Sequence, residues 1–160
     1  MSTTLRPALP EDEPFLFEVY ASTRTGELAL VPWTDEEKYA FVQMQFNAQR
    51  QSYVQQYPQA QWLIILHEEV PVGRLIVNRA EDEILLMDIA LLPEQRGCGI
   101  GTALINDLLA EARRTDRPVR LHVEYFNPAA RLYERLGFTQ IGEVGVYFEM
   151  EWRPTVDQVN

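Results

Sequence analysis

The sequence predicts a single α+β domain that spans residues 1–160. Apolar runs typical of strands alternate with apolar residues at helical spacing, in the order β-α-α-β-β-β-α-β-α-β-β. No internal repeat, low-complexity tract or linker interrupts this order in the sequence. A chain of 160 residues is long enough for one domain that buries about two-thirds of its unfolded surface.

One strand and two helices are predicted in the first third of the chain. Thr3 to Ala8 is a strand, and the proline and acidic residues after it begin a helix over Pro10 to about Arg24. Thr34 is a helix N-cap with Glu37 as its capping-box partner, and this second helix runs to about Tyr57. The core face of the first helix is predicted to contain Phe15, Leu16, Val19 and Tyr20.

Three strands are predicted in the middle of the chain. Gln61 to His67 and Val72 to Asn78 form an antiparallel hairpin around a loop over Glu68 to Pro71. Ile84 to Leu92 is apolar except for Asp88, which is typical of a central strand buried on both faces.

The last third predicts a helix, a strand, a short helix and a closing hairpin. In the short helix Asn127 is the N-cap, Pro128 the first helical residue and Gly137 the left-handed C-terminal position. The other predicted elements are a helix over Thr102 to Arg114, a strand over Val119 to Glu124, and hairpin strands over Phe138 to Ile141 and Gly145 to Trp152.

Composition excludes several classes of partner. The formal net charge of -10 argues against nucleic acid, because phosphate binding needs a basic face, and it would tolerate a small cationic amine. No apolar run reaches the roughly 18 residues that span a bilayer, and the N-terminus lacks the apolar core of a signal peptide, so we expect no membrane partner. Cys98 is the single cysteine, which favours a reducing, cytoplasmic location.

A glycine-rich turn joins the central strand to the following helix, with the pattern Arg96-x-x-Gly99-x-Gly101. Such a turn directs unpaired backbone N–H groups at one point and favours a phosphate ligand. The dinucleotide fingerprint would require glycine where Thr102 or Leu104 stands, and the sequence contains no Gly-Lys-Ser/Thr of a nucleotide-triphosphate loop. A tight connection without a ligand is the alternative.

Two segments in order resemble the GCN5-related N-acetyltransferase (GNAT) superfamily. They are Leu91-Leu92-Pro93-Glu94-Gln95-Arg96-Gly97-Cys98-Gly99-Ile100-Gly101 and Asn127-Pro128-Ala129-Ala130-Arg131-Leu132-Tyr133-Glu134-Arg135-Leu136-Gly137-Phe138. The resemblance implies a central mixed, mostly antiparallel sheet flanked by helices in α/β/α layers. It also implies direct transfer of an acetyl group from acetyl-CoA to an amine. One departure is that Asn127 lies two residues before Ala129, where many members leave three.

The resemblance implies where acetyl-CoA binds. Backbone N–H groups of the glycine turn would hold the pyrophosphate, and the main chain at the end of the preceding strand would pair with the pantetheine arm. Asn127 is expected either to hydrogen-bond coenzyme A or to act only as a helix cap. The implied binding residues are Ile89, Ala90, Leu91, Arg96, Gly97, Cys98, Gly99, Ile100, Gly101, Asn127 and Tyr133.

Three side chains are candidates for the chemistry. Tyr133 matches the family tyrosine near the thioester sulfur and would protonate the departing thiolate, or it packs its ring under the helix. His122 alternates with apolar residues and is a candidate base, or a solvent-facing histidine. Asp88 is the other candidate base, and an ion pair with Arg74 is the favoured alternative. A nucleophilic role for Cys98 is disfavoured because it occupies a variable position of the motif.

The first two helices are expected to shape the acceptor site. Candidate acceptor-binding residues are Arg24, Glu27, Gln45 and Gln49, with Tyr53 on the same helix face as the two glutamines. Solvated helix faces have the same pattern. We expect a small-molecule amine as acceptor, with a protein or peptide amine, or an acyl-CoA sensor without turnover, as alternatives. We expect no metal, and a homodimer follows only from the habits of the superfamily.

Overall fold

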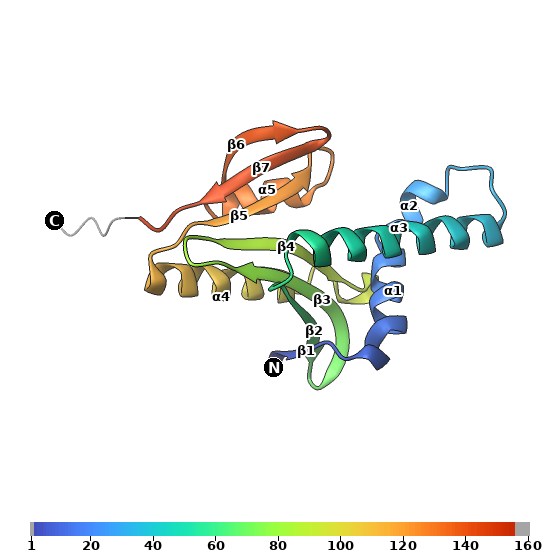
Figure 1. Ribbon diagram of the computed structural model, residues 1–160, viewed down its shortest axis with the longest axis horizontal. Helices are drawn as coiled ribbons and strands as arrows, with labels where there is room; N and C mark the ends of the chain where they lie inside the picture. Colours follow the sequence, from blue (N-terminus) through green and yellow to red (C-terminus); the bar gives the residue numbers. More distant parts are fainter. Residues whose placement is uncertain (1, 156–160) are drawn as a thin grey trace. The chain divides into compact units, whose positions relative to one another are not determined.

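The computed structural model describes residues 2–155, and its elements follow the predicted order (Figure 1). It adds α2 and two 3-10 turns that the sequence pattern did not predict. The elements are β1 (Thr3–Pro7), η1 (Pro10–Asp12), α1 (Glu13–Ser22), α2 (Thr25–Leu28), α3 (Asp35–Gln56), β2 (Gln61–His67), β3 (Val70–Arg79), β4 (Ile84–Leu91), η2 (Pro93–Gln95), α4 (Ile100–Thr115), β5 (Val119–Glu124), α5 (Ala129–Arg135), β6 (Thr139–Val144) and β7 (Tyr147–Trp152).

Within the described residues the strands form one seven-stranded sheet in the order β1-β2-β3-β4-β5-β7-β6. The pair β4 and β5 is parallel, with Ile84 opposite Val119, whereas β1 and β2, β5 and β7, and β6 and β7 are antiparallel. The sheet is therefore mixed and mostly antiparallel, as the sequence predicted.

The chain packs as two compact units, and each is described by itself. The first contains the residues up to Ile76 together with Asp88–Gly101, and the second contains Val77–Met87 and the residues from Thr102 onward. Strands β3 and β4 each contribute residues to both units. The assignment of the whole chain to a single domain stays a prediction.

In the first unit α1 and α3 pack against one another, with Phe17 edge-on to Phe46 at 5.5 Å between ring centroids (Figure 1). The expected core face of α1 is largely confirmed, since three of its four predicted residues are buried and Phe15 is partly buried. The core of this unit is formed by Leu16, Tyr20, Leu28, Val42, Phe46 and Ile64.

The starts of both long helices in this unit are fixed by local hydrogen bonds. The Thr34 hydroxyl accepts from the Glu37 amide at 3.1 Å and the Glu37 carboxylate accepts from the Thr34 amide at 2.9 Å, which confirms the predicted capping box. Before α1, Asp12 accepts two hydrogen bonds from Arg6 and one from the Leu9 amide. These bonds, led by the one from Arg6, lower the pKa of Asp12 to about 2.

Two turns are shorter than the sequence suggested. Val70 already belongs to β3, so the turn after β2 contains only Glu68 and Glu69, whose φ values of 50° and 69° match a two-residue hairpin turn. Strand β6 extends to Val144, so Gly145, with φ of 60°, lies in the turn rather than in the last strand. In both hairpins the strands were predicted, but the residues of the turn between them were not placed correctly.

In the second unit β5, β7 and β6 lie side by side (Figure 1). Gly137 follows α5 with a φ of 104°, which confirms its predicted left-handed position. A Cβ there would come within 3.1 Å of the Trp152 indole, so the site also needs glycine for space.

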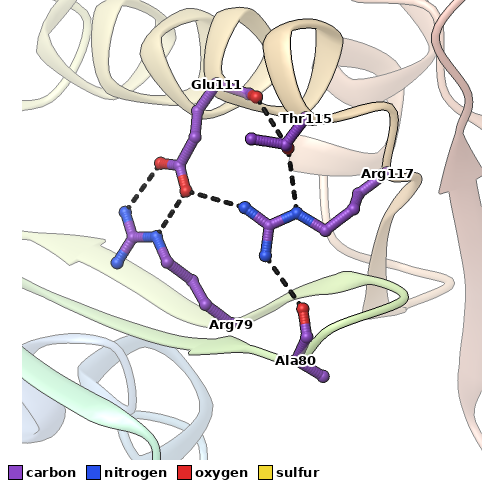
Figure 2. A network of polar contacts seen from close by, with 5 residues as sticks. All are labelled: Arg79, Ala80, Glu111, Thr115 and Arg117. Atoms are coloured by element: carbon purple, nitrogen blue, oxygen red, sulfur yellow. Dashed lines mark hydrogen bonds and ion pairs between the residues drawn. The ribbon is translucent and has the colours of Figure 1, made fainter.

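A network of charged side chains joins the end of α4 to the turn between β3 and β4 (Figure 2). Glu111 accepts from the Arg79 guanidinium at 2.8 and 3.0 Å and from Arg117 at 3.2 Å. Arg117 also donates to the Thr115 hydroxyl at 2.9 Å and to the Ala80 carbonyl oxygen at 2.8 Å. The hydrogen bond from Arg79 is the main reason that the pKa of Glu111 lies below its ordinary value.

Candidate active site

The predicted site residues lie in both units. The first unit contains the glycine turn, the end of β4 and the four candidate acceptor residues. The second contains His122, Asn127 and Tyr133.

The glycine turn has the backbone that an anion site needs. Gly97 and Gly99 have φ values of 76° and 84°, which favour glycine, and a Cβ at either position would meet no atom within 4 Å. The helix α4 begins at Ile100, two residues earlier than predicted, so the turn leads directly into its unpaired first-turn N–H groups. The predicted diphosphate site therefore has left-handed, open backbone at two of its glycines.

Arg96 is exposed, and its side chain is held by two hydrogen bonds within the first unit. Its Nε donates to the Leu91 carbonyl oxygen at 3.0 Å, and its Nη2 donates to the Ser22 hydroxyl at 3.2 Å. The guanidinium therefore ties the turn to the end of β4 and to the last residue of α1.

Gly73 on β3 is a residue that the sequence analysis missed. A Cβ at this position would lie 2.3 Å from the Ala90 carbonyl oxygen and 3.1 Å from the Leu91 Cα. In the same place the Leu92 amide donates to the Val72 carbonyl oxygen at 2.9 Å. Only glycine lets β3 approach the strand end that is expected to align the pantetheine arm. A lone glycine within a strand pattern was the available signal.

Asp88 is held by Arg74, as the favoured alternative for that residue predicted. The Arg74 Nε donates to the Asp88 carboxylate at 2.6 Å, and its Nη2 donates to the Gln49 side-chain oxygen at 2.8 Å. The guanidinium also lies over the Tyr20 ring, 5.4 Å from its centroid. The structure thus brings a candidate base and a candidate acceptor residue to one buried arginine.

The other candidate acceptor residues lie on α3 and at the start of α2. Arg24 and Glu27 form an ion pair at 2.9 Å, and the Arg24 guanidinium lies over the Tyr20 ring, 5.2 Å from its centroid. Gln45 is partly buried one turn before Gln49. A cavity of about 350 Å³ lies among α1, α2 and α3, and none of the candidate acceptor residues lines it. Its lining includes Phe17, Thr25, Leu28, Lys38, Tyr39 and Val42.

In the second unit His122 is exposed on β5 while Leu121 and Val123 are buried, so the predicted alternation is confirmed. Its cross-strand neighbour on β7 is Glu149. Tyr133 is 8% exposed and its ring is edge-on to Phe138 at 5.6 Å between centroids. The predicted catalytic roles of His122 and Tyr133 stay predictions.

Asn127 lies just before α5, and the helix begins one residue later than predicted. The Asn127 side-chain oxygen accepts from the Ala129 amide at 2.9 Å, and Pro128 stands before the first helical residue rather than at it. This bond supports the start of the helix, but the N-cap position is Pro128 rather than the predicted Asn127. The proposed contact of Asn127 with coenzyme A stays a prediction.

Two further features concern metals and membranes. Among residues 2–155 no group of three or more histidine, cysteine, aspartate or glutamate side chains could hold a metal ion. None of the helices in that range is long and apolar enough to cross a membrane.

Cys98 is exposed, and its thiol donates to the Arg96 carbonyl oxygen at 3.7 Å.

Comparison with known proteins decides the family. A sequence model described as the acetyltransferase (GNAT) family matches residues 16–138. The chain belongs to the GNAT family. The match runs from α1 to Phe138, three residues beyond the end of α5, and so includes both motifs from which the resemblance was drawn.

Individual relatives agree with this assignment. The [ribosomal protein bS18]-alanine N-acetyltransferase of Haemophilus influenzae is 34% identical over 71 residues, which is 44% of this chain and 49% of that protein. The chain is thus similar to about half the length of this curated relative.

Solved GNAT structures share the fold. PaiA N-acetyltransferase from Thermoplasma acidophilum, in complex with coenzyme A, superposes with a TM-score of 0.71 at 20% identity, covering 96% of this chain and 99% of that one. The ribosomal-protein-S18-alanine N-acetyltransferase of Escherichia coli gives 0.63 at 19% identity, covering 99% and 98%. The GNAT fold predicted from the sequence is therefore confirmed.

Proposed function

We propose that this GNAT protein is an acetyl-CoA-dependent N-acetyltransferase that transfers an acetyl group directly to the primary amine of a small molecule. The observation that carries the proposal is the glycine turn. Gly97 and Gly99 hold left-handed backbone in open space immediately before a helix of 16 residues. This arrangement suits the diphosphate of coenzyme A, and the family match supports the same donor.

The protein's contribution to such a transfer is alignment. Acetyl-CoA supplies a thioester that amines attack without prior covalent activation. Backbone N–H groups from Arg96 to Gly101 would fix the diphosphate, and the main chain of Ile89, Ala90 and Leu91 would orient the arm that ends in the thioester. Holding the two reactants in position supplies several kcal/mol of the barrier.

Proton transfers complete the reaction. The amine nitrogen forms a bond to the acetyl carbon while the bond from that carbon to sulfur breaks, and the electron pair of that bond leaves with sulfur. Tyr133 would give its phenolic proton to the thiolate, and His122 or Asp88, through water, would take the proton that the amine loses. These roles follow from the family motif and from the residue types.

A protein N-terminus is the second candidate acceptor. The 34% identity to a ribosomal protein alanine N-acetyltransferase favours it, because that enzyme is named for an alanine in a protein. The identity covers 71 residues. A cytoplasmic location and a homodimer remain predictions, and both are compatible with either class of acceptor.

One experiment separates these possibilities from a sensor without turnover. Thiol release from acetyl-CoA is measured against polyamines, amino acids, aminoglycosides and peptides, while calorimetry measures the binding of coenzyme A. Thiol release with any amine supports the enzyme, and the best amine identifies the acceptor class. Coenzyme A binding without thiol release would favour the sensor, and a lack of binding would overturn the donor assignment.

A further inference from the structure

We propose that Arg74 and Gln45 form an acceptor subsite that recognises a primary amine next to a carbonyl group, as in an amino acid or a peptide N-terminus. The proposal rests on the proposed acetyl transfer and names the class of acceptor. It is carried by two buried polar atoms that the protein itself leaves unpaired.

Arg74 is 2% exposed, yet only part of its guanidinium is satisfied. Nε donates to Asp88 and Nη2 donates to Gln49. Nη1 and the side-chain oxygen of Gln45 are both buried and have no hydrogen-bond partner among the described residues. Buried N–H and C=O groups are nearly always paired, so an unpaired donor and an unpaired acceptor point to a bound group that the chain does not supply.

The two atoms belong to neighbouring positions. Gln45 and Gln49 are four residues apart on α3, which places their side chains on one face of the helix. The Gln49 side chain binds the Arg74 guanidinium directly, so Gln45 lies one turn away on the helix face that meets Arg74. Both residues lie in the first unit.

The cluster adjoins the expected donor site along the chain. Asp88 immediately precedes Ile89, Ala90 and Leu91, the strand end assigned to the pantetheine arm. The Asp88 side chain is 26% exposed, so a carboxylate beside the buried guanidinium is open to an incoming cationic group. An acceptor bound here would present its amine close to the strand that aligns the thioester.

The unpaired atoms select a ligand with both a donor and an acceptor. The carbonyl oxygen of an α-amino carbonyl compound would accept from Arg74 Nη1, and its amine N–H would donate to the Gln45 oxygen. The Asp88 carboxylate would balance the charge of the ammonium form before it loses a proton. A simple alkylamine or polyamine offers no acceptor, so it would leave Nη1 unpaired and bind less well.

The test compares two acceptors that differ in one group. L-Alaninamide and isopropylamine carry the same methyl-substituted amine, and only the first has a carbonyl. Their ratio of kcat/KM is measured in the wild type and in the variants Gln45→Met and Arg74→Lys. Gln55→Met is the matched control, because it makes the same change at an exposed position of the same helix. Comparing ratios between proteins cancels the different intrinsic reactivities of the two amines.

We expect the ratio to fall by about 10-fold or more in Gln45→Met and in Arg74→Lys, with KM of the amide raised and the control unchanged. A second comparison measures kcat/KM for L-alanine and for an alanyl dipeptide amide, and so distinguishes a free amino acid from a peptide N-terminus as the acceptor. If Arg74→Lys does not fold, as judged by circular dichroism, the result for Gln45→Met decides. An unchanged ratio in folded Gln45→Met would mean that water satisfies the two atoms, and would overturn the proposal.

A binding measurement keeps this test independent of turnover. Calorimetry with L-alaninamide and with isopropylamine is carried out on the protein saturated with coenzyme A. Preferential binding of the amide that is lost in Gln45→Met supports the subsite even if acetyl transfer fails. Equal binding of the two amines overturns the subsite even if acetyl transfer succeeds.

Discussion

A Cβ at position 73 would lie 2.3 Å from the carbonyl oxygen of Ala90, a separation that real side chains do not show. The atom it would meet is backbone, so β3 or β4 would have to shift. We expect Gly73→Ala to lower the free energy of unfolding by about 2 kcal/mol, measured by urea denaturation, and to weaken coenzyme A binding. Gly26→Ala is the control, since a Cβ there would meet no atom within 4 Å. Equal stability of the two variants would contradict the close approach.

Gly99→Asp should reduce the affinity for coenzyme A by about 100-fold, measured by calorimetry. The substitution adds a negatively charged side chain where the diphosphate is expected. Two negative charges in contact repel each other, which weakens binding when no positive charge compensates them. Gly145→Asp is a matched control, because Gly145 also has a positive φ and open space around it. Both variants place a Cβ on backbone with a positive φ, 84° at Gly99 and 60° at Gly145. Equal loss of affinity in both would show that strain, rather than the turn, is responsible.

Tyr133→Phe should lower kcat by about 10-fold to 100-fold while leaving the affinity for coenzyme A nearly unchanged. The substitution removes the proposed acid but keeps the ring that packs on Phe138. Tyr147→Phe, at an exposed position of β7, is the control for loss of a tyrosine hydroxyl. A normal kcat in Tyr133→Phe would remove that residue as the acid.

Glu111→Gln should destabilise the protein by about 1 kcal/mol at neutral pH, because it removes the charge that two arginines share (Figure 2). The pKa of Glu111 in the folded protein lies below its ordinary value of 4.5, chiefly because Arg79 donates to it. The stabilisation is therefore complete above pH 4.5 and is lost as the pH falls through the folded pKa.

The pH dependence gives this prediction a second readout. Urea denaturation of the wild type and of Glu111→Gln should converge as the pH falls below 4.5. Asp107→Asn, at an exposed position of the same helix, is the control and should change stability by less than about 0.5 kcal/mol. A constant difference between wild type and Glu111→Gln from pH 7 to pH 3 would contradict the role of the charge.

Sequence spacing alone predicted the features that depend on neighbours along the chain. The capping box of Thr34 and Glu37, the left-handed Gly137 and the order of the elements were all confirmed, since each depends on a few adjacent residues. The two motifs also indicated the family, because the turn and the α5 segment are continuous pieces of sequence. The short helix α2 was missed because four residues contain too little periodicity to reveal it.

Only the tertiary structure decided which distant residues meet. The sequence offered Arg74 as a partner for Asp88, but it did not indicate that Gln49 would bind the same guanidinium from α3. A lone glycine within a strand pattern marked position 73, but the sequence did not indicate that the Ala90 carbonyl oxygen is the atom that approaches it. Such contacts join strands and helices that are separated by tens of residues, and the packing of those elements, rather than local spacing, determines them. The sequence by itself therefore indicated the family and predicted the donor, whereas the fold decided which buried polar atoms lie without a partner, because their surroundings come from distant segments.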